Sequence, residues 1–217
     1  MNGTLEVILV TILLSVLLSF GSSRMMALIK LMALQGALVS LTPIFLEPGV
    51  RLSNGGILFF QLMFLIKAVL IPGLLYLALT RISIKREVEP LIGYHASLVA
   101  GIVLVLVAVA ISRGLSATLH GENTLLLISA ITTLGGGLFL MMSRSKALTQ
   151  VIGYLMLENG IYLVGTALTK HARSIYLVEF GVLLDLLVGV MIMGIILYNI
   201  NRAFDDVDTT FLGQLKD

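Results

Sequence analysis

Three ionisable side chains lie within apolar stretches that are long enough to cross a lipid bilayer. Lys67 lies in FFQLMFLIKAVLIPGLLYLAL, Glu158 in TQVIGYLMLENGIYLVGTALT and Asp185 in LVEFGVLLDLLVGVMIMGIILY. A charge at mid-bilayer depth costs roughly 2.5–3.5 kcal/mol on insertion scales, so such residues are seldom kept without a use. An amine and two carboxylates at this depth can exchange protons. We therefore predict that these three residues form part of a path for protons or sodium ions.

Glu158 is surrounded by small residues, namely Gly153, Gly160 and Gly165. Glycines in a membrane helix let a neighbouring helix come close or leave a gap that water can fill. A low dielectric disfavours the charged form of a carboxyl group, so an unpaired Glu158 could exchange a proton near neutral pH. The alternative is a hydrogen-bonded glutamate that only holds helices together.

Two further carboxylates belong to the last apolar stretch. Asp185 is about ten residues into it, or roughly 15 Å along a helix axis. Glu179 precedes Asp185 by six residues, about 9 Å along the axis and roughly 120° around it. The two do not share a helix face, so they predict successive steps of a path rather than a carboxylate dyad. Glu179 alone could equally reach the membrane interface.

Lys67 is the cation that matches these carboxylates. Pro72 cannot donate a hydrogen bond to the carbonyl of Ala68, which predicts a kink beside the lysine. A lysine at this depth can release its proton or stay charged beside a carboxylate, and the alternative is a static ion pair that locks two helices. Lys30 lies closer to the end of its stretch and can extend to the interface, so it is a weaker candidate.

The composition defines the class of protein. The chain has 217 residues, of which 58% are hydrophobic and 12% charged, and its mean hydropathy is +1.07. This balance is typical of a polytopic membrane protein. The basic residues form no run or stripe, so no nucleic-acid partner is expected.

The same sequence argues against cofactor chemistry within this chain. The absence of cysteine excludes thiolate-bound zinc, iron–sulfur clusters and disulfides that use this chain alone. The three histidines lack a metal-ligand spacing, and no phosphate-loop or dinucleotide motif is present. We therefore expect no metal, no cofactor and no catalytic residue, and enzymatic chemistry is not expected of this chain.

Helices must position the ionisable residues, because every backbone polar group in lipid has to be paired within its own segment. A bilayer core of about 30 Å needs about 20 helical residues. The sequence predicts an all-α polytopic membrane protein with about seven transmembrane helices. Their expected ranges are 5–20, 25–45, 57–79, 96–111, 124–142, 149–169 and 175–200.

Basic residues in alternate loops predict the orientation. One set is Arg24, Arg81, Lys85, Arg86, Arg144, Lys146, Arg202 and Lys216, and the other is Arg51, Arg113, Lys170 and Arg173. The larger set is expected to be cytoplasmic, which places the N-terminus outside and the C-terminus inside. We predict three parts: a four-helix membrane region over residues 1–111, a three-helix region over 112–204 and an acidic cytoplasmic tail over 205–217.

Three stretches carry a resemblance to a known family. QVIGYLMLENGIYLVG followed by LVEFGVLLDLLVGVMIM, together with FLIKAVLIP and the tail DVDTTFLGQLK, resembles hydrogenase-4 component E. That membrane subunit is found in formate hydrogenlyase and related group 4 membrane-bound hydrogenases. The last three expected helices look like the K-type subunit of respiratory complex I and the C subunit of Mrp-type sodium/proton antiporters.

The resemblance implies a function. Glu158 would match the second-helix glutamate of the K-type subunit, which belongs to the central hydrophilic axis of those complexes. Asp185 would match the third-helix acid, although that family usually has glutamate there, and Glu179 competes for the role. Lys67 fits the component E pattern. The chain would then be a multi-pass subunit in the cell inner membrane, with no redox centre of its own, that contacts other membrane subunits including antiporter-like ones.

Three alternatives remain. One is a subunit of a non-redox Mrp-like cation/proton antiporter, and another is a purely structural membrane anchor. A self-sufficient secondary transporter would normally show internal repeats and broken helices around a midplane site. This sequence shows little of that beyond Pro72 and the GGG at 135–137.

Overall fold

The computed structural model describes residues 3–46, 60–81, 92–119, 124–144, 146–168 and 188–194. These ranges are almost entirely helical and contain no extended strand. Six helices within them are long and apolar enough to cross a membrane, which confirms the polytopic helical class. Of the expected seventh helix, only residues 188–194 are described, and they are helical.

The helices follow the apolar stretches closely. Their bounds are α1 Gly3–Gly21, α2 Met25–Leu46, α5 Tyr94–Leu119, α6 Thr124–Ser143 and α7 Ala147–Leu168. The third span, Phe60–Thr80, contains the π-helix η2 Leu65–Leu70, which is followed directly by α4 Ile71–Arg81. The largest difference from expectation is α5, which continues past the predicted end at 111. Ser112, Arg113 and Gly114, interpreted as a linker, continue the helix instead.

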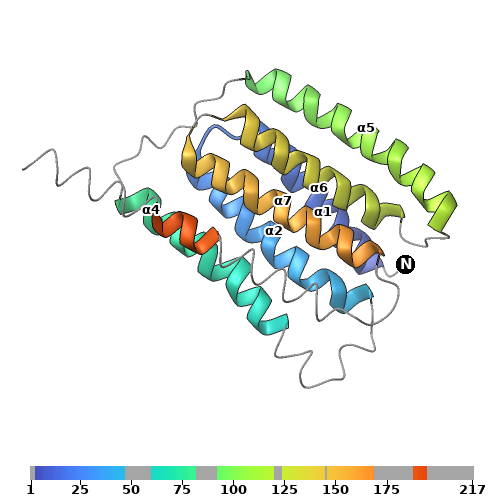
Figure 1. The fold of residues 1–217 in the computed structure, drawn as a ribbon, viewed down its shortest axis with the longest axis horizontal. Helices are drawn as coiled ribbons and strands as arrows, with labels where there is room; N and C mark the ends of the chain where they lie inside the picture. Colours follow the sequence, from blue (N-terminus) through green and yellow to red (C-terminus); the bar gives the residue numbers. More distant parts are fainter. Residues whose placement is uncertain are drawn as a thin grey trace, which may run out of the picture.

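Two helical hairpins form the centre of the molecule. Helices α1 and α2 make one layer and α6 and α7 make the other, with α1 against α6 and α2 against α7 (Figure 1). Helix α5 packs on α1 and α6 at one edge, while η2 and α4 pack on α2 at the other. Helix α7 is the most enclosed of the six. In its apolar 18-residue stretch 67% is buried, compared with 17% in the corresponding stretch of α5. The helix that carries Glu158 is therefore the central one.

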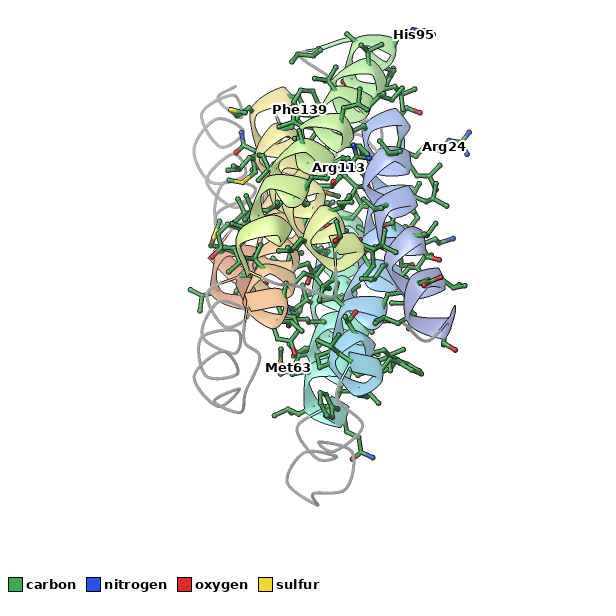
Figure 2. All side chains as sticks on the ribbon, turned by 90° about the vertical axis from the view of Figure 1, so that its right-hand side faces the viewer. Arg24, Met63, His95, Arg113 and Phe139 are labelled. Carbon is green, nitrogen blue, oxygen red and sulfur yellow. The ribbon has the colours of Figure 1, made fainter. Side chains whose placement is uncertain are left out.

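Successive helices run in opposite directions, so loops alternate between the two ends of the bundle. Arg24 in the α1–α2 loop and His95 at the start of α5 lie towards one end, and Met63 lies towards the other (Figure 2). The α6–α7 loop lies at the same end as Arg24, because the side chain of Arg144 donates a hydrogen bond of 2.9 Å to the carbonyl of Phe20. Arg24, Arg144 and Lys146, all from the larger basic set, therefore share one end of the bundle.

Candidate functional site

Lys67 projects from a widened turn of its helix. Residues Leu65–Leu70 form a π-helix, and the N–H of Ile71 donates to the carbonyl of Ile66, five residues earlier. Pro72 follows at once and has no N–H to continue either hydrogen-bond pattern. Single π-turns within α-helices are rare and occur frequently at functional sites. The break predicted from Pro72 thus takes the form of a π-helix that contains the lysine.

Helix α2 approaches the backbone of this turn at a glycine. A Cβ atom at Gly36 would lie 2.6 Å from the carbonyl oxygen of Lys67 and 3.1 Å from its Cβ. No side chain fits at these distances, so glycine at this position allows η2 to lie directly against α2. The position of Lys67 is therefore set by its own helix and by α2.

Helix α7 is held against α6 by three glycines. A Cβ atom at Gly137 would lie 2.3 Å from the backbone nitrogen of Leu157, and one at Gly160 would lie 2.3 Å from the backbone nitrogen of Leu134. Gly153 is similarly close to the backbone of Met141, at 2.8 Å. Of the two outcomes expected for glycines near Glu158, close helix packing is the one present at Gly153 and Gly160.

The side chains of Lys67 and Glu158 form a buried ion pair. The ammonium of Lys67 donates to Oε1 of Glu158, and Oδ1 of Asn159 lies 3.4 Å from the same nitrogen. Only 5% of Lys67, 1% of Glu158 and 4% of Asn159 is exposed. Of the alternatives for Lys67, the structure has the one in which it lies beside a carboxylate.

A small cavity adjoins the pair between α2, η2 and α7. Its lining residues are Met32, Gly36, Lys67, Ile71, Pro72, Leu155 and Asn159. The centre of a water molecule could occupy about 10 Å³ of it, and a site for one buried water needs on the order of 10–15 Å³ by that measure. Lys67 and Asn159 are the lining residues with polar side chains.

This arrangement brings an ammonium and a carboxylate together. The two groups are an acid and a base, and charges interact strongly in a low dielectric. Within the described ranges, no cluster of three histidine, cysteine, aspartate or glutamate side chains could hold a metal ion. The chemistry available at this site is acid–base exchange.

The remaining predicted residues lie elsewhere. Glu179 and Asp185 fall outside the described residues. Lys30 is exposed on α2 and does not belong to the buried site. Of the predicted site residues, the structure therefore brings together Lys67 and Glu158.

Among the described residues, sequence reasoning missed the burial of three amide or guanidinium side chains. Asn159 follows Glu158 directly, and Gln35 is fully buried in the middle of α2. Both are amides within apolar stretches, which is the signal that could have identified them. Arg144 was assigned to a loop as a topology signal, although only 1% of it is exposed.

Arg144 is a second buried cation, at the end of the bundle. Besides its bond to Phe20, its guanidinium lies over the ring of Tyr94, 5.3 Å from the centroid. Within the described ranges no ion pair joins Arg144 to a carboxylate, and Nε and Nη1 have no hydrogen-bond partner there. Burial lowers the pKa of Arg144, and Tyr94 offsets this in part. Arg144 ties the two hairpins together, whereas Lys67 pairs with a carboxylate.

The fold and the site define a polytopic helical membrane protein with a buried lysine–glutamate pair. The chain is 31% identical over 193 residues to the uncharacterized protein Rv0085 of Mycobacterium tuberculosis, covering 88% of this chain and 86% of that protein. It belongs to the same family as that mycobacterial protein.

A shorter match covers hydrogenase-4 component E of Escherichia coli strain K12, at 34% identity over 80 residues. It spans 37% of this chain and 36% of that protein's length, and the Shigella flexneri protein of the same name matches equally. No protein-family model matches the chain. No solved structure shows significant similarity. The partial match to hydrogenase-4 component E agrees with the resemblance noted in the sequence and suggests a membrane subunit.

Proposed function

We propose that this protein is a multi-pass inner-membrane subunit of a hydrogenase-4-like assembly related to complex I, and that the Lys67–Glu158 pair forms part of its path for protons or sodium ions. The observation that carries the proposal is the pair itself: an ammonium and a carboxylate, each no more than 5% exposed, that meet between helices of hydrophobic protein. The partial similarity to hydrogenase-4 component E supports the parent assembly. Redox centres would belong to other subunits.

The pair has the physical properties that a relay needs. In a low dielectric an ion pair is strongly coupled, so a charge that appears on either side shifts the proton between the two groups. The lysine projects from a π-turn next to a proline, and such turns occur frequently at functional sites. The cavity next to Lys67 and Asn159 can hold water that connects the pair to further groups. Asp185 and Glu179 remain proposed as later steps of the path.

A purely structural role is the main competitor, and the close packing around the pair favours it. A buried ion pair often adds little net stability, whereas removing one partner leaves a costly unpaired charge. Assembly alone therefore does not separate a relay from a lock. A subunit of an Mrp-like antiporter would use the same pair without redox chemistry.

The experiment that separates these functions is Glu158→Gln in the complex that co-purifies with the tagged chain. The amide keeps the size of the side chain and can still accept a hydrogen bond from Lys67, but it cannot exchange a proton. We expect hydrogen-driven proton uptake into inverted membrane vesicles, followed with a pH-sensitive dye, to fall by at least about 100-fold, the scale of a lost general acid–base group. Unchanged proton uptake by the assembled complex would reject the relay.

We also propose that the end carrying Arg24, Arg144 and Lys146 faces the cytoplasm, as the distribution of basic residues predicts. The chain has no cysteine, so single cysteines can be introduced without background labelling. Gly3 is the first residue of α1 and Ser23 lies in the loop after its other end, and both positions are exposed. A membrane-impermeant maleimide added to intact spheroplasts should label Gly3→Cys and leave Ser23→Cys unlabelled. The reverse pattern would invert the orientation.

A further inference from the structure

Gln35 is a polar side chain in the core that nothing described so far explains. It lies in the middle of α2 and is fully buried. Neither its side-chain oxygen nor its side-chain nitrogen has a hydrogen-bond partner within the described ranges. Buried amides in native proteins are nearly always hydrogen-bonded, and ordered water is a common partner where protein atoms are lacking.

Gln35 is not itself a lining residue of the cavity beside the ion pair, but its neighbours on α2 are. Met32, three residues before it, and Gly36, directly after it, both line that cavity. Residues three apart lie on the same side of an α-helix. Gln35 therefore lies on the side of α2 that borders the cavity, and its side chain has three rotatable bonds.

Gln35 also lies at the same depth as Glu158. It is ten residues from the start of α2 at Met25, and Glu158 is eleven from the start of α7 at Ala147. Both helices begin at the end that the Arg144–Phe20 hydrogen bond ties together. At 1.5 Å per residue, both side chains are about 15 Å from that end.

A second unsatisfied polar group lies at this depth. Thr132 is eleven residues before the end of α6 at Ser143, which adjoins the same tied loops. It is fully buried, and its hydroxyl has no hydrogen-bond partner among the described residues. Amide and hydroxyl groups without protein partners thus occur on α2 and α6 at the level of the ion pair. This is the pattern that internal water satisfies.

We propose that Gln35 is a positioning residue of the Lys67–Glu158 site and that its amide holds ordered water which hydrates the pair from the side of α2. This inference rests on the proposed relay function. The water would accept a hydrogen bond from Lys67 and exchange hydrogen bonds with the Gln35 and Asn159 amides. Gln35 itself has no net change of protonation, because an amide is neither an acid nor a base near neutral pH.

The test uses Gln35→Met in the complex purified with the tagged chain. Methionine has nearly the same length and flexibility but cannot bind water, so the bundle should assemble normally. Leu34→Met is the matched control, because Leu34 is the adjacent residue and is 46% exposed. Two quantities are measured: hydrogen-driven proton uptake into inverted vesicles, and the infrared band of the Glu158 carboxyl group, assigned by its loss in Glu158→Gln.

For Gln35→Met we expect wild-type assembly, proton uptake slowed about tenfold, the scale for losing a residue that supports a functional group, and a shifted Glu158 band. Leu34→Met should change none of these. The inference is overturned if Gln35→Met pumps at the wild-type rate, if the band does not shift, or if assembly is lost. Its failure is distinct from failure of the relay, since Glu158→Gln would still abolish proton uptake.

Discussion

The protein buries two cations in different ways. Lys67 meets a carboxylate in the middle of the bundle, while Arg144 meets a backbone carbonyl and a tyrosine ring at its end. The partners of Arg144 are a backbone carbonyl and a phenol ring, and the hydrogen bond to Phe20 fixes the two hairpins to each other. In the Lys67–Glu158 contact the partner is a carboxylate. Burial alone therefore does not distinguish the two cations, whereas the kind of partner does.

The neighbourhoods of the two cations differ accordingly. Around Lys67 lie a π-turn, a cavity that can accommodate a water molecule and the amide of Asn159. Near Arg144 three residues separate α6 from α7, and the ring of Phe20 lies tilted against that of Phe139 with 4.9 Å between ring centroids. The region around Lys67 thus has space beside the charged groups, whereas the region around Arg144 is closely packed.

The largest difference between the two cations should appear on removal of Lys67. Lys67→Met leaves the Glu158 carboxylate buried without its counter-charge, a situation that costs about 3–5 kcal/mol in proteins. We expect the midpoint of thermal unfolding of the detergent-solubilised complex to drop and proton uptake per assembled complex to be lost.

Lys30→Met is the matched control for this variant. It removes the same cation from an exposed position on α2, where surface substitutions change stability by about 0.5 kcal/mol or less. Equal effects of the two variants would mean that burial beside Glu158 gives Lys67 no special role.

A smaller effect is expected at Arg144. Arg144→Met removes a charge-assisted hydrogen bond and the contact with Tyr94, but it also removes the cost of burying a guanidinium. The net loss of unfolding free energy should be about 1–2 kcal/mol, measured by thermal unfolding of the purified complex. Proton uptake per assembled complex should match the wild type. A loss of uptake without a loss of stability would place Arg144 in the path and remove the contrast between the cations.

Much of the fold follows from the apolar stretches. Their length alone predicted the helices α1, α2, α6 and α7 to within a few residues, because a bilayer-spanning helix needs a nearly fixed number of apolar residues. The end of α5 was missed, since Ser112 and Arg113 look like a linker although they adopt helical geometry there. Polar residues such as Ser112 and Arg113 are compatible with helical geometry, so they do not by themselves indicate the end of a helix.

The site was predictable in its members but not in its contacts. Lys67 and Glu158 stand out because each interrupts an apolar stretch, yet 91 residues separate them. Nothing in either stretch specifies that η2 packs against α2 at Gly36 and so faces α7. Pro72 predicted a break in the helix, while the form of the break depends on the packing around Lys67. The burial of Arg144 was not predictable, because a loop position says nothing about burial by neighbouring helices.

The most direct measurement is proton uptake by the double variant Lys67→Met/Glu158→Gln. Removing both charges removes the unpaired ion, and buried ion pairs can often be replaced by neutral side chains without loss of stability. We predict that this variant assembles and unfolds like the wild type while its hydrogen-driven proton uptake stays at least about 100-fold reduced. Recovery of proton uptake together with assembly would show that the pair only locks helices, and would contradict the relay.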